Sequence, residues 1–195
     1  MTRTATVHRV TGETDVRVTL DLDGAGRADV ITGLGFLDHM LTALSKHSRI
    51  DLKVHATGDL HIDDHHTVED VALAIGEALA QAAGERRGIR RFGHAYAPLD
   101  EALARAVIDL SGRAWPAIDL GLRRQHLGTV ATENLTHWFQ SFAMAARLTL
   151  HVDVLKGDND HHRCEAAFKA LALALRDAIA RTGGDEIPST KGVLA

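Results

Sequence analysis

The sequence predicts an α+β fold built from two similar halves, each with a mainly antiparallel sheet covered by helices that pack in a central layer. Two pairs of segments support this: Val16–Gly24 resembles Ala104–Gly112, and Leu52–Asp59 resembles Leu150–Asp158, in the same order along the chain. Such ordered recurrence indicates an internal repeat. Each half also ends in a long helical pattern with an apolar face, and pairing the halves would bury both faces in one core.

The composition is that of a globular protein, with 195 residues of which 45% are hydrophobic and 25% charged. A net charge of -4 and 4% aromatic residues argue against a nucleic-acid partner. No apolar run is long enough to span a membrane, and Met1–Val10 lacks the apolar core of a secretory signal. The single cysteine, Cys164, cannot form an internal disulfide. We therefore expect a cytoplasmic protein.

In the first half, Val16, Val18, Leu20 and Leu22 alternate with polar residues, which predicts a half-buried strand before the turn at Asp23. We expect a β-meander to start each half. The pattern then predicts a helix over residues 36–47, an alternating strand over 50–57 and a long helix over 64–83.

The second half repeats this order, with a helical stripe formed by Phe168, Leu171, Ala172, Leu175 and Ile179. The charged, glycine-flanked stretch 84–88 is the natural joint between the halves. We therefore divide the chain into residues 1–88 and 89–195, which together form one structural unit.

The strongest chemical signal is a duplicated pattern, His65-His66-x-x-Glu69 and His161-His162-x-x-Glu165. In a helix, residues four apart share a face, so the first histidine and the glutamate of each copy can bind one ion. The second histidine lies about 100° further round the axis. Adjacent histidines on one helix therefore tend to serve different ions.

His39 and His137 lie upstream of these copies, by 65 minus 39 = 26 and 161 minus 137 = 24 residues. The whole set contains six histidines and two glutamates, enough for two metal sites. Three nitrogens and one carboxylate suit octahedral Mn(II) or Fe(II) with open positions, and equally a four-coordinate Zn(II). The spacing does not choose among these metals.

Several other residues are candidates for binding an anion or for moving a proton. In the tail, hydroxyl and ammonium groups precede a glycine. Two arginines elsewhere in the chain, and a lysine that lies one helical turn after Glu165, add positive charge. Each could instead be an ordinary surface residue. Glu13, in a turn between two alternating segments, could project as a general base. The anion-binding candidates are Arg91, Arg113, Lys169, Ser189, Thr190 and Lys191.

Together these motifs resemble the imidazoleglycerol-phosphate dehydratase family, over the full length of the chain. The segments that carry the resemblance are residues 35–40, residues 61–66 with Glu69 and Asp70, and residues 97–101, 109–113, 161–169 and 188–193. The resemblance implies two Mn(II) ions per subunit, held by His39, His65, His66, Glu69, His137, His161, His162 and Glu165.

The resemblance also implies a function in histidine biosynthesis, the dehydration of imidazoleglycerol phosphate to imidazole acetol phosphate. The expected route passes through a metal-bound imidazolate and a diazafulvene-like intermediate. Catalytic roles fall to Glu13, Glu165 and His65. The expected substrate contacts are Glu13, His39, His47, His65, His66, Glu69, Arg91, Arg113, His161, Lys169, Ser189, Thr190 and Lys191.

The resemblance further implies a homo-oligomer, a cage of 24 subunits in which neighbouring subunits complete each metal site. Ala43 departs from the family pattern, which has a glutamine in the helix after His39. A polar substrate contact is then missing or replaced, without consequence for the reaction itself.

Two other classes of protein would also carry histidine and glutamate on helices. A four-helix di-iron carboxylate protein would be nearly all helical, whereas this chain has at least four alternating segments. A non-catalytic shell, in which ions only join subunits, would have no use for cations gathered around an anion.

Overall fold

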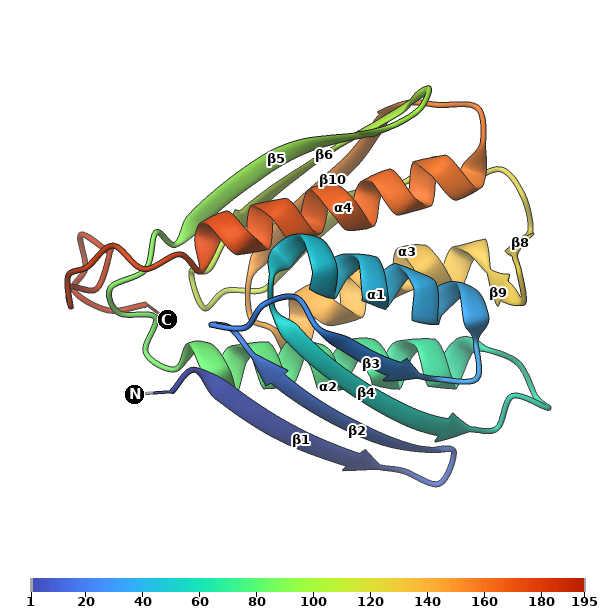
Figure 1. The fold of residues 1–195 in the computed structure, drawn as a ribbon, viewed down its shortest axis with the longest axis horizontal. Coiled ribbons are helices and arrows are strands. Elements are labelled where there is room, and N and C mark those ends of the chain that lie inside the picture. Colours follow the sequence, from blue (N-terminus) through green and yellow to red (C-terminus); the bar gives the residue numbers. More distant parts are fainter. Residues whose placement is uncertain (1, 195) are drawn as a thin grey trace.

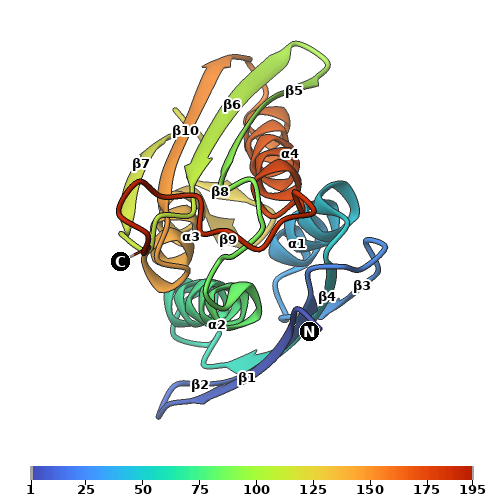
Figure 2. The same cartoon turned by 90° about the vertical axis from the view of Figure 1, so that its left-hand side faces the viewer.

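The computed structural model describes residues 2–194. Two four-stranded sheets form its outer layers, and four long helices lie between them (Figure 1, Figure 2). This confirms the α+β fold with duplicated halves that the repeated segments predict. None of the helices within residues 2–194 combines the length and the apolar character needed to cross a membrane.

The first sheet has the strand order β1-β2-β4-β3, and two helices of the same half cover its inner face. The predicted helices and strands of this half are all present, within one or two residues of the expected ends. The elements are β1 (Thr4–Val10), β2 (Thr14–Asp21), β3 (Ala28–Ile31), α1 (Gly35–Ser48), β4 (Asp51–Gly58) and α2 (His65–Ala83).

The expected β-meander is wrong for the third strand of each half. β1 and β2 form an antiparallel hairpin and β4 pairs antiparallel with β2, but β3 lies at the sheet edge, parallel to β4. A parallel neighbour needs a crossover connection, and α1 supplies it. The short strand β3 comes just before α1 in the chain and pairs with β4, so it is not adjacent to the β1–β2 hairpin.

The second sheet repeats the arrangement, with the order β5-β6-β10-β7 and a parallel pair between β7 and β10. A two-stranded hairpin, β8–β9, precedes α3 and was not predicted. The elements are β5 (Phe92–Leu99), β6 (Ala102–Asp109), β7 (Trp115–Asp119), β8 (His126–Leu127), β9 (Val130–Ala131), α3 (Thr132–Ala145), β10 (Thr149–Lys156) and α4 (Asp160–Ala178).

The helices pack across the two halves. α2 of the first half lies against α3 of the second, and α1 lies against α4 (Figure 2). Four fully buried aromatic rings fill the centre of the layer, with centroids 4.6 to 5.3 Å apart in each contact. These rings belong to Trp138, Phe139 and Phe142 of α3 and to Phe168 of α4. In both helix pairs, α1 with α4 and α2 with α3, one helix comes from each half.

Gly76 allows α2 to approach α3 closely. A Cβ atom at this position would lie 2.6 Å from the Phe142 carbonyl oxygen and 2.8 Å from the Ala146 nitrogen. Because both are backbone atoms, Gly76→Ala would force the helices apart. Overpacking costs about 1–3 kcal/mol. We expect a cost in the upper part of this range, which exceeds the roughly 1 kcal/mol that alanine gains over glycine in a helix.

We therefore expect Gly76→Ala to lower the free energy of unfolding of the chelator-treated protein, measured by denaturant titration. Gly35→Ala is the matched control, because a Cβ atom at the first residue of α1 would meet nothing within 4 Å. A Gly76→Ala variant as stable as the Gly35→Ala variant would contradict this account of the contact.

Candidate metal centre

All eight predicted ligands lie in the first two turns of the four helices, at one end of the helix layer (Figure 1). Side chains from the preceding loops accept backbone N–H groups at the starts of α2 and α4. The His65 backbone N–H donates to Asp63 Oδ1 at 2.7 Å, and the His161 N–H donates to the Asn159 side chain at 2.9 Å. Such caps satisfy N–H groups that have no partner within the helix.

Two buried aspartates tie these helix starts to the segment before α3. Asp64 accepts a hydrogen bond from the Ala131 N–H at 2.9 Å. Asp160 accepts from the N–H groups of Arg123 and Arg124 at 2.7 and 2.6 Å. The ends of α2, α3 and α4 are therefore held in fixed relation, which positions the ligands that they carry.

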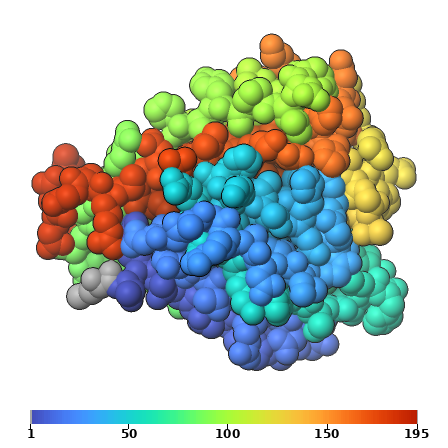
Figure 3. All heavy atoms as spheres, viewed as in Figure 1, coloured from blue at the N-terminus to red at the C-terminus, as the bar shows by residue number. Residues whose placement is uncertain are grey.

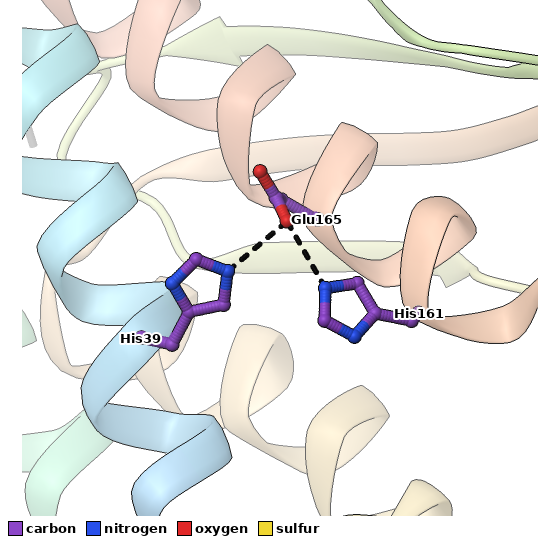
Figure 4. A group of neighbouring side chains, drawn as sticks. All are labelled: His39, His161 and Glu165. Carbon is purple, nitrogen blue, oxygen red and sulfur yellow. Dashed lines mark hydrogen bonds and ion pairs between the residues drawn. The ribbon is translucent and has the colours of Figure 1, made fainter.

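The first cluster of ligands joins the two halves of the chain (Figure 4). His39 of α1 and His161 of α4 each direct Nε2 at the same carboxylate oxygen, Glu165 Oε2, at 3.1 and 3.2 Å. One donor atom from each residue lies within 4.8 Å of the others. Two imidazoles and a carboxylate at this spacing suit Mn(II), Fe(II) or Zn(II).

Glu165 is held as a carboxylate in this cluster. Burial by itself would raise its pKa, but hydrogen bonds from Lys169 and His39 outweigh burial and lower the pKa to about 2. Lys169 Nζ lies 2.7 Å from Glu165 Oε1, one helical turn away. The carboxylate is therefore ionised at neutral pH, the form that binds a cation.

The second cluster is built in the same way from the opposite elements. His137 of α3 lies with Nε2 3.3 Å from Glu69 Oε1, and His65 Nε2 lies 3.8 Å from Glu69 Oε2. The two imidazole rings stack with centroids 5.0 Å apart. Asn134 accepts a hydrogen bond from His65 Nδ1 at 2.9 Å, which leaves Nε2 of His65 free to bind an ion.

His66 and His162 belong to neither cluster within this chain. His66 Nδ1 lies 3.0 Å from Asp59 and His162 Nδ1 lies 2.7 Å from Glu101. The adjacent rings on each helix are nearly perpendicular, at 82° and 88°. The two histidines of each pair therefore face different surroundings, as their helical positions predict.

Glu13 lies beside His66, at the turn between β1 and β2. Its Oε1 is 3.6 Å from His66 Nε2, and its side chain is half exposed. Thr11 Oγ1 accepts the Glu13 and Thr14 N–H groups, and Asp70 of α2 accepts a hydrogen bond from Thr14 Oγ1. The turn that carries Glu13 is therefore fixed to α2.

The predicted anion-binding residues do not gather in one place within the chain. Lys169 lies at the first cluster, where it also faces His47, whose pKa is lowered by burial and by that ammonium group. Arg91 holds Asp109 with two hydrogen bonds of 2.7 and 3.1 Å, and donates a third to the Pro188 carbonyl at 2.7 Å.

The tail and the exposed Arg113 lie away from both ligand clusters. The tail forms one end of the molecule, and the starts of the helices form the other (Figure 1, Figure 3). A turn orders the tail, because Ser189 Oγ accepts the Lys191 N–H at 3.2 Å and Thr190 lies between them. One chain therefore does not bring its own Ser189, Thr190 and Lys191 to its own ligand clusters.

The partners of the histidine Nδ1 atoms were not predicted from the sequence, and they are Asp59, Glu101 and Asn134. Glu101 ends the segment 97–101, which carries part of the family resemblance, and Asp59 ends one of the repeated segments. Asp59 lies in the loop before α2 and Glu101 lies 61 residues before His162, so no helical period points to either contact. Ala43, the departure from the family pattern, is buried in α1.

The fold and the site together define a duplicated α+β protein with two histidine–carboxylate clusters able to hold divalent metal ions. A model of the family described as imidazoleglycerol-phosphate dehydratase matches residues 32–175. The chain belongs to the imidazoleglycerol-phosphate dehydratase family, and by that membership it is an enzyme of the hydro-lyase class.

Relatives and solved structures agree with this assignment. The chain is 54% identical to imidazoleglycerol-phosphate dehydratase of Eremothecium gossypii, over 99% of this chain and 98% of that protein. It is 56% identical to that of Granulibacter bethesdensis, over the whole of both chains. The crystal structure of the Staphylococcus aureus enzyme superposes with a TM-score of 0.83 and 36% identity, covering 92% of this chain and 99% of that one.

Proposed function

We propose that the protein dehydrates imidazoleglycerol phosphate to imidazole acetol phosphate in histidine biosynthesis, and that the reaction depends on two Mn(II) ions per subunit. Family membership supports the reaction. One observation carries the metal dependence: two clusters, each of two imidazoles and one carboxylate, lie at the same end of the helix layer.

The residues of each cluster would hold one ion and leave positions open for other ligands. His39, His161 and Glu165 form one set, and His65, Glu69 and His137 form the other. Three donors are fewer than the six that Mn(II) prefers, so further ligands must come from outside the cluster. His66 and His162 are available for this, because each is directed away from the cluster on its own helix.

This geometry supports sharing of the ion sites between subunits. His66 and His162 would complete the ion sites of neighbouring copies, and the tail of a neighbour would bring Ser189, Thr190 and Lys191 to the clusters. The observation that supports this step is the position of the tail at the opposite end of its own chain. We propose a closed homo-oligomer of 24 subunits, in keeping with symmetric assembly through repeated interfaces.

The positions of the residues support a separate chemical role for each of them. When bound, the two ions would act as Lewis acids on the nitrogen atoms of the substrate imidazole, which makes the ring an electron sink. Loss of hydroxide from the carbon next to the ring and of a proton from the following carbon gives an enol, which becomes the ketone. Glu13 would take that proton, and its half-exposed carboxylate beside His66 supports this role.

The remaining residues bind and orient the substrate. Glu165 and His65 hold the ions and thereby fix the position of the ring. Arg91, Arg113, Lys169, Ser189 and Lys191 would hold the phosphate group, because guanidinium and ammonium groups pair with phosphate oxygens. His47 lies near Lys169 and Thr190 precedes Lys191 in the chain, and both would complete the pocket around the glycerol chain. The free, buried Cys164 fits a reducing compartment, and we propose the cytoplasm.

Incubating the Mn(II)-loaded protein with imidazoleglycerol phosphate tests this proposal. We expect the ketone product to accumulate, while glycerol 3-phosphate, which has no ring, is left unchanged. A fully loaded protein that releases no ketone would refute the proposal and favour the non-catalytic, metal-assembled shell. Phosphate-ester binding that strengthens with Mn(II) is expected of the enzyme and not of the shell.

A further inference from the structure

Asp59 and Glu101 make the same contact in the two halves, each at the Nδ1 atom of the second histidine of a pair, although they lie at non-equivalent places in the repeat. Asp59 lies in the loop after β4, with its carboxylate oxygens 3.0 and 3.2 Å from His66 Nδ1. Glu101 lies in the turn between β5 and β6, with Oε2 2.7 Å from His162 Nδ1. Different loops therefore supply the same contact.

This contact decides which ring nitrogen can bind an ion. A carboxylate only accepts hydrogen bonds, so the Nδ1 atom that faces it must carry the proton. In a neutral imidazole the lone pair then lies on Nε2. The Nε2 atoms of His66 and His162 lie 3.6 Å from Glu13 Oε1 and 4.0 Å from Asp100 Oδ2, at the outer ends of the two hairpins.

Backbone hydrogen bonds tie both residues to neighbouring segments. Glu101 Oε1 accepts the N–H groups of Asp158 and Asn159 at 3.1 and 2.9 Å, immediately before α4. The Asp59 N–H donates to the Glu13 carbonyl at 3.1 Å, which ties the loop to the first hairpin. Each carboxylate therefore holds its histidine in one orientation.

We propose that Asp59 and Glu101 are positioning residues that fix the tautomer and direction of His66 and His162, so that each presents Nε2 to an ion held by another copy of the chain. The inference rests on the proposed function, because it takes His66 and His162 as ligands. Removing a residue that hydrogen-bonds the other ring nitrogen of a metal-binding histidine typically weakens metal binding by about 10- to 100-fold.

Glu101→Gln tests the proposal, because glutamine keeps the shape of the side chain. Its amide oxygen can still accept the Asp158 and Asn159 N–H groups, whereas its NH₂ group would face His162 Nδ1. The histidine must then accept at Nδ1 and carry its proton on Nε2, which prevents Nε2 from binding an ion. We expect one of the two Mn(II) ions per subunit to bind about 10- to 100-fold more weakly, measured by calorimetric titration of the metal-free protein.

Asp100→Asn is the matched control. Asp100 is the neighbouring residue in the same turn, and it approaches Nε2 at 4.0 Å instead of Nδ1. Its backbone is left-handed, with φ of 47°, a conformation that asparagine also adopts. We expect Mn(II) affinity in this variant to stay within about twofold of the wild-type value.

Two further variants separate positioning from a merely structural role. Asp59→Asn should weaken one ion in the same way, and Glu101→Gln combined with His162→Ala should lose no more affinity than His162→Ala alone. Unchanged Mn(II) affinity in Glu101→Gln, with a lowered unfolding temperature of the metal-free protein, would overturn the proposal. If the wild-type protein itself binds no Mn(II), the proposed function fails instead, so the two failures are distinguishable.

Discussion

Turnover of imidazoleglycerol phosphate is expected to fall by at least about 10³-fold after treatment with a chelator and to return when Mn(II) is added. A bound divalent ion supplies several kcal/mol of transition-state stabilisation, and about 4 kcal/mol corresponds to a 10³-fold change in rate. The imidazoles and carboxylates of each cluster lie 3.1 to 3.8 Å apart, and none of these groups is itself a Lewis acid. The substrate ring then has no Lewis acid to help it lose a proton.

The effect of single ligands is expected to be equally large and confined to one cluster. His39→Ala should remove one ion per subunit, and His137→Ala should remove the other, as measured by metal analysis after gel filtration. His8→Ala is the control, because His8 lies exposed on the outer sheet face and pairs only with Asp15 and Arg17 among the described residues. Full turnover by a protein shown to be free of metal would exclude metal-dependent catalysis.

Replacement of Glu13 by glutamine is expected to lower kcat by about 10²- to 10⁴-fold, the usual contribution of a general acid or base. Glutamine cannot accept the proton lost from the substrate carbon. Glu13 belongs to neither cluster, so both ions should remain bound. The turn should also keep its position, because its hydrogen bonds to Thr11 and Asp59 come from the backbone of residue 13.

Steady-state kinetics together with metal analysis of the same samples check this prediction. Glu85→Gln makes the same chemical change at an exposed glutamate just after α2, at the end of the helix remote from the clusters, and should leave kcat unaltered. Near-normal turnover by a fully loaded Glu13→Gln variant would remove Glu13 from the role of proton acceptor. A variant that loses both turnover and metal would show that Glu13 acts on ion binding.

The elements that the sequence predicts correctly are those whose signal is local. Alternation of apolar residues along β2 and the apolar stripe of α2 arise from the period of a strand and of a helix, and both faces are buried as expected. The third strand of each half was misplaced because its neighbour in the sheet is set by a crossover helix. The β8–β9 hairpin was missed because two-residue strands carry no period.

The candidate ligands could be chosen from the sequence because the pattern is duplicated, and a set of three residues seldom recurs at the same spacing by chance. The partners of those ligands could not be identified in this way. Asn134, Asp59 and Glu101 reach their histidines from other elements of the chain, and Glu101 lies 162 minus 101 = 61 residues from its histidine. Their contacts depend on how loops meet at the end of the helix layer.

The sequence by itself determined the repeat, most of the secondary structure and the choice of eight candidate ligands, because each of these follows from local spacing. Only the tertiary structure decided how the ligands combine. His39 of the first half joins His161 and Glu165 of the second, and His137 joins His65 and Glu69, because α1 packs against α4 and α2 against α3. Burying the apolar faces of both halves in one core forces this exchange, and no feature of either copy alone specifies it.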